Sequence, residues 1–124
     1  LRPASVIGDG VRIGSFVECK NAQIGDGAKI AHLAYVGDAE LGARVNVGCG
    51  VVFVNFDGRR KAKSIVGEGA FLGSNCNLVA PVRVGAGCFI AAGTTLTRDL
   101  ADGDFCIGRC RENIRRNGAE KYLT

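Results

Sequence analysis

An aliphatic residue followed by glycine recurs along this chain at intervals close to six residues. The pair appears as Ile7-Gly8, again as Ile13-Gly14, and continues to Val84-Gly85. When other residues are allowed in place of the glycine, three six-residue steps make one turn. The first residues of the pairs then fall at 7, 13, 19; 24, 30, 36; 41, 47, 53; 66, 72, 78; and 84, 90, 96. A fixed short period of this kind indicates a solenoid, in which each repeat packs mainly on its neighbours.

The six-residue step also defines the shape of the solenoid. Six extended residues span about 20 Å at about 3.3 Å each, so three short strands joined by bends close a triangular coil. Equivalent residues such as Ile7, Ile24 and Leu41 then stack inside the coil as aliphatic ladders. Amphipathic helices need apolar spacings of three and four, and a sandwich needs alternation and hairpin turns. We therefore predict an all-β protein, a parallel β-helix of about five coils over residues 1–98.

Two segments depart from the repeat. Between Phe53 and Val66 the step lengthens to 13 residues, which predicts an outward loop near residues 54–65. After Leu96 we expect the repeat to end and residues 99–124 to form a C-terminal extension. That extension is expected to contain turns and to allow a short polar helix from about Glu112 to Leu123, interrupted by Gly118.

Composition narrows the functional classes. The chain has 47% hydrophobic residues against 23% charged, and no apolar run approaches the about 20 residues of a membrane span. We expect a cytoplasmic protein without a membrane partner. The net charge of +4 comes from scattered basic residues without interleaved aromatics, so small anions are favoured over nucleic acid as partners. The absence of methionine predicts that further residues precede Leu1.

Cysteine and histidine usage bears on metals and catalysis. The six cysteines include no C-x-x-C pair and stand mostly at repeat positions, which indicates reduced packing residues. His32 is the single histidine, so a metal site is not expected. On these residues alone, a lone histidine at a corner is more often an ordinary surface residue than a catalytic one.

Several longer motifs are more specific than the repeat. They are Leu1-Arg2-Pro3, Gly14-Ser15-Phe16-Val17-Glu18-Cys19-Lys20-Asn21, His32-Leu33-Ala34-Tyr35-Val36-Gly37-Asp38-Ala39-Glu40, Asn46-Val47-Gly48-Cys49-Gly50, Asn55-Phe56-Asp57-Gly58, Gly73-Ser74-Asn75 and Leu78-Val79-Ala80-Pro81-Val82. Through them the chain resembles the C-terminal domain of the bifunctional GlmU family, glucosamine-1-phosphate acetyltransferase joined to N-acetylglucosamine-1-phosphate uridyltransferase. The resemblance runs over nearly the whole chain.

The resemblance implies a fold, an assembly and an activity. The β-helix would be left-handed, the protein a homotrimer with its site between subunits, and the reaction acetyl transfer from acetyl-CoA to the amine of glucosamine 1-phosphate. The product would enter UDP-N-acetylglucosamine and peptidoglycan precursor synthesis. No Gly-rich phosphate loop is present, so uridyl transfer is not expected.

Site residues follow from the matching motif positions. His32 matches the general base, and Asn55 matches the residue that orients the base or the acceptor amine. The positions matching sugar-phosphate contacts are Arg2, Lys20, Tyr35, Asn46 and Lys61. Those matching acetyl-CoA contacts are Cys49, Ser74, Ala92 and Arg109.

Two residues depart from the family pattern. Phe56 stands where the family has tyrosine, and Cys49 stands where it usually has alanine. Phe56 keeps open an acetyltransferase for a different amino sugar. A non-catalytic trimeric scaffold or sugar-phosphate binder is a further alternative. A scaffold would need only the aliphatic ladders, so the presence together of His32, Asn55, Lys20, Tyr35 and Lys61 argues against it.

Overall fold

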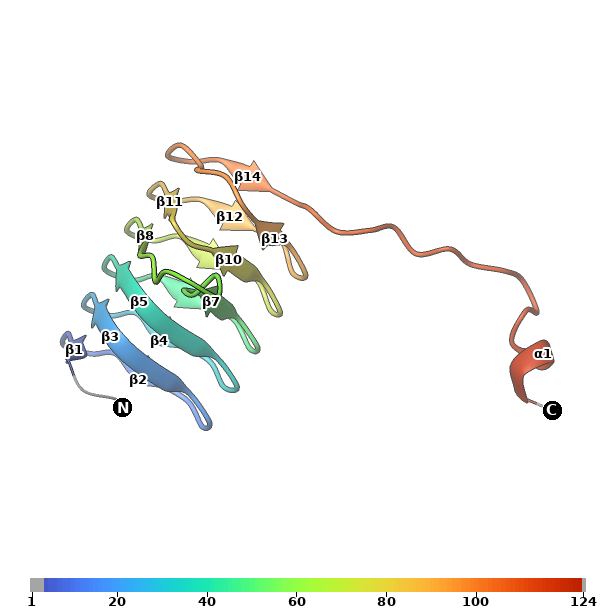
Figure 1. The fold of residues 1–124 in the computed structure, drawn as a ribbon, viewed down its shortest axis with the longest axis horizontal. Helices are drawn as coiled ribbons and strands as arrows, with labels where there is room; N and C mark the ends of the chain where they lie inside the picture. Colours follow the sequence, from blue (N-terminus) through green and yellow to red (C-terminus); the bar gives the residue numbers. More distant parts are fainter. Residues whose placement is uncertain (1–3, 124) are drawn as a thin grey trace.

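The computed structural model describes residues 4–123 and shows the predicted parallel β-helix, with coils stacked along one axis (Figure 1). Strands pair in parallel with their counterparts in the next coil and form two sheets. The first sheet contains β1 (Val6–Ile7), β3 (Glu18–Ile24), β5 (Tyr35–Leu41), β7 (Val52–Val54), β8 (Ser64–Val66), β10 (Asn77–Val79), β11 (Val82–Val84) and β13 (Thr95–Leu96). The second contains β2 (Arg12–Ile13), β4 (Lys29–Ile30), β6 (Asn46–Val47), β9 (Phe71–Leu72), β12 (Phe89–Ile90) and β14 (Phe105–Cys106). This arrangement is consistent with the left-handed coil implied by the resemblance.

The two sheets provide three faces because strands of the first sheet bend. In β3 and β5 the bend falls at Asn21 and Asp38, whose φ angles are 48° and 47°. Asparagine and aspartate tolerate this left-handed conformation better than most residues. We call the second sheet the phenylalanine face and the face that contains Tyr35 the tyrosine face.

Two corners border the tyrosine face. The histidine corner comprises the turns at residues 31–34, 48–51, 73–76 and 91–94, which connect the phenylalanine face to the tyrosine face. The loop corner comprises residues 20–22, 37–39, 54–63 and 80–81 at the opposite edge. Both corners provide residues to the candidate site.

The core is built from the predicted ladders. Ile30 pairs with Ile13 on one side and Val47 on the other, and the ladder continues through Leu72 and Ile90. Ile30 is only 2% exposed, and the later members of the ladder are also buried. Side chains alternate across each short strand, so these aliphatic residues point inward while their neighbours point outward. The predicted register is therefore confirmed.

The repeat continues further than predicted. Leu100 forms a parallel bridge with Val84, and β14 pairs with β12, so a partial sixth turn follows Leu96. Cys106 packs against the core at the end of this turn. The structure therefore has about six turns, where the repeat alone predicted about five coils.

The C-terminal helix is also shorter than predicted. Within residues 112–123, α1 (Glu120–Leu123) is the one helical segment. Asn117 has a φ of 58°, and Gly118 follows it, so the backbone turns before a longer helix can form. The segment after β14 extends away from the coils (Figure 1). None of the helices within residues 4–123 has the length and apolarity needed to cross a membrane.

The outward loop joins β7 to β8 and is braced by its own backbone. Asp57 Oδ1 accepts hydrogen bonds from the N–H groups of Arg59 at 2.8 Å and Arg60 at 2.7 Å. The Ala62 N–H donates to the Asn55 carbonyl at 2.9 Å. These contacts hold the first and last parts of the loop together.

Three phenylalanines form a column on the outside of the phenylalanine face. The ring centroids of Phe71 and Phe89 lie 4.6 Å apart, and those of Phe89 and Phe105 lie 5.8 Å apart. All three side chains are exposed. The column was not predicted, because the repeat identifies inward positions and leaves the outward ones unconstrained.

Candidate functional site

Four of the predicted site residues occupy one row along the histidine corner. The Gly50 N–H donates to the His32 carbonyl at 3.1 Å, the Asn75 N–H to the Cys49 carbonyl at 2.8 Å, and the Gly93 N–H to the Ser74 carbonyl at 2.9 Å. His32, Cys49, Ser74 and Ala92 therefore hold the same position in successive coils. We call these four residues the corner row.

The geometry of the corner row suits an extended ligand. Adjacent coils are about 4.8 Å apart, so His32 and Ala92 are separated by about 14 Å along the axis. Arg109 flanks the far end, where Nη1 donates to the Ala92 carbonyl at 2.7 Å. His32, Ser74 and Ala92 are exposed and Cys49 is half-buried. Among the described residues, the Cys49 N–H donates to no protein acceptor.

A hydrogen-bonded cluster lies at the loop corner. Asn55 Nδ2 donates to the Tyr35 hydroxyl at 3.1 Å and to Asp38 Oδ2 at 2.8 Å. Asn21 Nδ2 donates to the other oxygen, Asp38 Oδ1, at 2.8 Å. Asp38 is 9% exposed, while Tyr35 and Asn55 are half-buried and reachable by a ligand.

Asp38 is the charged member of this cluster, and two lysines beside it supply the positive charge at this corner. The hydrogen bond from Asn21 is the main cause that lowers the pKa of Asp38, and the bond from Asn55 lowers it further. Burial opposes this shift, and the positive charges of Lys61 and Lys20 support it. The structure therefore brings both predicted lysines near Asp38, one from the loop and one from β3.

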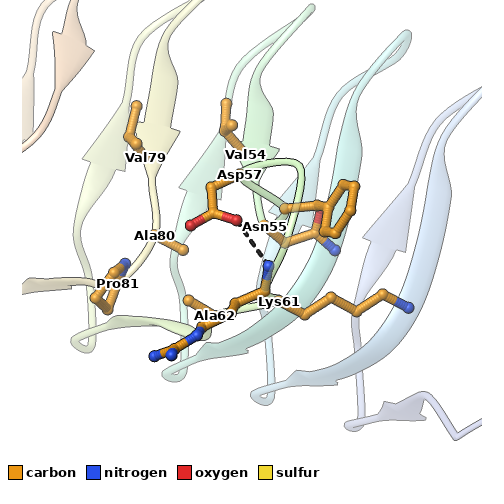
Figure 2. A pocket seen from close by; sticks show the side chains of 10 residues that line it. Val54, Asn55, Asp57, Lys61, Ala62, Val79, Ala80 and Pro81 are labelled. Atoms are coloured by element: carbon orange, nitrogen blue, oxygen red, sulfur yellow. Dashed lines mark hydrogen bonds between the residues drawn. The ribbon is translucent and has the colours of Figure 1, made fainter.

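A recess of about 310 Å³ lies between the outward loop and the next coil (Figure 2). Asn55 and Lys61 are in its wall, and the Lys61 side chain extends away from Pro81 (Figure 2). The lining residues are Val54, Asn55, Phe56, Asp57, Arg60, Lys61, Ala62, Val79, Ala80 and Pro81. The recess gives a small ligand at the loop corner a mostly apolar wall with cations at its edge.

A single chain does not bring all the predicted residues together. Asn46 lies on the phenylalanine face, where β6 pairs with β4 and β9, and so faces away from Tyr35. No hydrogen bond joins His32 to Asn55 within the part of the chain that the structure describes. They stand at opposite edges of the tyrosine face. Arg2 lies outside the described residues.

Sequence reasoning missed Asp38 and Asn21 as members of the site. Their spacing was a usable signal, because Asn21, Asp38 and Asn55 follow one another at intervals of 17 residues. That interval is one coil in this part of the chain, so it predicts a vertical polar ladder at one corner. Across residues 4–123, no group of three or more His, Cys, Asp or Glu side chains is arranged to hold a metal ion.

Comparisons with known proteins agree with this geometry. Residues 63–98 match the family described as bacterial transferase hexapeptide (six repeats). The bifunctional protein GlmU of Clostridioides difficile is 56% identical over 98% of this chain and 26% of its own length. The GlmU of Shouchella clausii is 52% identical over 98% of this chain and 27% of its own length. The chain thus spans about a quarter of the curated relatives it matches.

Two solved structures share the fold. The acetyltransferase domain of PglB from Neisseria gonorrhoeae, in complex with acetyl coenzyme A, has a TM-score of 0.77 at 23% identity and covers 86% of this chain and 49% of that chain. The H141A mutant of GDP-perosamine N-acetyl transferase from Caulobacter crescentus, in complex with CoA and GDP-perosamine, has a TM-score of 0.66 at 32% identity. The match covers 86% of this chain and 51% of that chain.

Proposed function

We propose that this chain, which belongs to the hexapeptide-repeat family of bacterial transferases, moves the acetyl group of acetyl-CoA to the amine of an amino sugar. The observation that carries the proposal is the corner row. Its four residues, with Arg109 at the far end, form a line along which an extended thioester can lie with its acetyl end near His32. The names of the relatives and of the solved neighbours support this activity.

His32 is the general base of the proposed reaction. It takes a proton from the acceptor ammonium, and the freed amine attacks the thioester carbonyl. The carbon–nitrogen bond forms, the carbon–sulfur bond breaks, and CoA leaves as a thiolate that takes up the second amine proton. The Cys49 N–H is available to donate to the thioester oxygen as negative charge develops there.

The loop corner is proposed to hold the acceptor as a sugar phosphate, glucosamine 1-phosphate. Lys20 and Lys61 supply positive charge to a phosphate dianion, and the Tyr35 hydroxyl can donate to it. The recess beside Asn55 has room for part of a sugar ring.

We further propose that the complete site lies between subunits of a homotrimer. Asn46 and the outward phenylalanine column occupy one face, whereas Tyr35, Asp38 and Asn55 lie on or beside another. Packing the phenylalanine face of one subunit on the tyrosine face of the next would cover the exposed rings. The same packing would add Asn46 to the acceptor site and bring His32 of one subunit to the acceptor held at the loop corner of the next.

A thiol-release assay tests the proposed function. The protein is incubated with acetyl-CoA and one acceptor at a time: glucosamine 1-phosphate, glucosamine 6-phosphate, glucosamine and GDP-perosamine. We expect release of CoA to be fastest with glucosamine 1-phosphate and slow without the phosphate. Release no faster than in the acceptor-free control for every compound would refute the proposal, and binding without turnover would favour a sugar-phosphate binder.

A second acceptor class has one observation in its favour. Phe56, at the mouth of the loop corner, is exposed and has no hydroxyl to bond to a sugar. A solved neighbour at 32% identity is named for a nucleotide-linked amino sugar. Faster turnover of GDP-perosamine than of glucosamine 1-phosphate would assign the chain to this class.

A further inference from the structure

The side chains of Asn21, Asp38 and Asn55 form a ladder whose hydrogen-bond direction is determined by its middle member. A carboxylate has two oxygens and no hydrogen, so it can only accept. Asn21 and Asn55 must therefore both turn Nδ2 toward Asp38, at 2.8 Å each. The burial of Asp38 makes any other arrangement costly, because an amide oxygen facing the carboxylate would leave a charge without a donor.

This direction is passed on to Asn55 and Tyr35. One Nδ2 hydrogen of Asn55 goes to Asp38 and the other to the Tyr35 hydroxyl at 3.1 Å. Asn55 Oδ1 is then the atom with which this side chain can accept a hydrogen bond. The Tyr35 hydroxyl already accepts from Asn55, so its own proton is directed to a different partner.

The backbone is shaped to allow this contact. Gly37 lies beneath the pair, and a methyl group there would sit 2.6 Å from Asn55 Nδ2 and would overlap the Tyr35 hydroxyl. Only glycine leaves room for both groups at this position. Gly37 thus allows the close contact of Tyr35 and Asn55, and the Asp38 carboxylate determines how the Asn55 amide is oriented within it.

We propose that Asp38 is a positioning residue for the acetyl acceptor, which turns Asn55 Oδ1 toward the acceptor amine and leaves the Tyr35 proton for its anionic group. The lone pair of the acceptor amine attacks the thioester, so only its N–H groups can form hydrogen bonds with the protein. They need a hydrogen-bond acceptor. A phosphate needs donors. The inference rests on the proposed function and assigns to Asp38 and Asn21 roles that the motif match did not include.

The substitution Asp38→Asn tests the inference with little change in shape. Asn21 shows that asparagine adopts the same corner conformation in this fold, with φ of 48° against 47° at Asp38. Asparagine at position 38 can donate to Asn55, which lets the Asn55 amide reverse and present Nδ2 to the amine. We expect kcat/KM for the acceptor to fall by at least about tenfold, the effect of one lost hydrogen bond in the transition state, with KM for acetyl-CoA unchanged.

A double-mutant cycle separates positioning from a purely structural role. If Asp38 acts through Asn55, then Asp38→Asn should change kcat/KM by less than about twofold in an Asn55→Ala background. A matched control is Asp102→Asn, at another corner, where Asp102 Oδ1 accepts from the Ala86 N–H at 2.8 Å. An asparagine oxygen can still accept there, so wild-type kinetics are expected.

Two kinetic results would overturn the inference. One is a wild-type kcat/KM in Asp38→Asn; the other is a decrease in kcat/KM by the same factor in the presence and in the absence of the Asn55 side chain. If the variant does not fold, NMR of the unmodified protein decides, with the Asn55 side-chain amide assigned by its loss in Asn55→Ala. Its protons should exchange more slowly than those of the exposed Asn117. Equally fast exchange would contradict the ladder. Wild-type inactivity with every acceptor would instead refute the proposed function.

Discussion

Ile30→Asp is the perturbation that tests the coil register most severely. Ile30 is 2% exposed and stacked between Ile13 and Val47 in the neighbouring coils. Its adjacent residue, Lys29, belongs to the same two-residue strand and points outward. Lys29→Asp is therefore a matched control that introduces the same side chain one position away.

The expected loss of folding free energy in Ile30→Asp follows from the burial of this side chain. Removing the isoleucine side chain loses about 1.5–3 kcal/mol of hydrophobic stabilisation. An unpaired carboxylate in the same place costs several kcal/mol more, or must be protonated. The sum, about 5 kcal/mol or more, compares with a total stability of about 5–15 kcal/mol for a domain of this size. Ile30→Asp should therefore unfold most or all of the protein at room temperature.

Urea unfolding followed by circular dichroism measures this effect. We expect Lys29→Asp to retain a cooperative transition close to that of the wild type, and Ile30→Asp to show little or no folded baseline. Similar midpoints for the two variants would mean that residue 30 does not face the core. The ladder register would then be wrong.

Three further outcomes are expected. His32→Ala should lower kcat by about 10²-fold or more with unchanged circular dichroism, because the proposed general base is removed from an exposed position; unchanged turnover would remove His32 from the mechanism. Mixing inactive Asn46→Ala and Lys61→Ala subunits through dissociation and reassembly should restore about a quarter of wild-type activity, since half the chains keep each residue and a site needs both. No recovery would contradict a shared site. Because the pKa of Asp38 is lowered on folding, its stabilising effect is present above about pH 4 and lost as the pH falls through the lowered value. Melting temperatures from pH 5 to 2 should therefore fall more steeply for the wild type than for Asp38→Asn, and parallel curves would contradict this effect.

The aliphatic ladders were predictable because the spacing of the repeat identifies their residues directly. Each inward residue, such as Val47 or Leu72, stands at a regular step, and burial of an aliphatic side chain there needs no information beyond the spacing. The partial sixth turn was missed because the step from Leu96 to Leu100 is shorter than those before it.

The candidate site was less predictable than the core, because its contacts join residues one coil apart. The motif positions identified Tyr35 and Asn55, but the hydrogen bond between them depends on the backbone bend at Asp38. A single outward aspartate after an aliphatic-glycine pair has the same sequence appearance as any solvated corner residue. Its place between Asn21 and Asn55 is indicated in the sequence only by the spacing of 17 residues, one coil, on each side.

The phenylalanine column shows the same limit on the outer surface. Phe71, Phe89 and Phe105 are at outward positions, where the repeat pattern imposes no residue type. Their stacking follows from strand pairing across three coils, so it required the register to be known first.

The central claim is that this chain transfers an acetyl group from acetyl-CoA to the amine of an amino sugar. Its most direct test is mass spectrometry of the reaction with glucosamine 1-phosphate, run beside a quantitative thiol assay. The account predicts N-acetylated sugar phosphate and free CoA in equal amounts, with both products strongly reduced for His32→Ala. Free CoA without acetylated sugar, or no CoA release with any amino sugar tested, would contradict it.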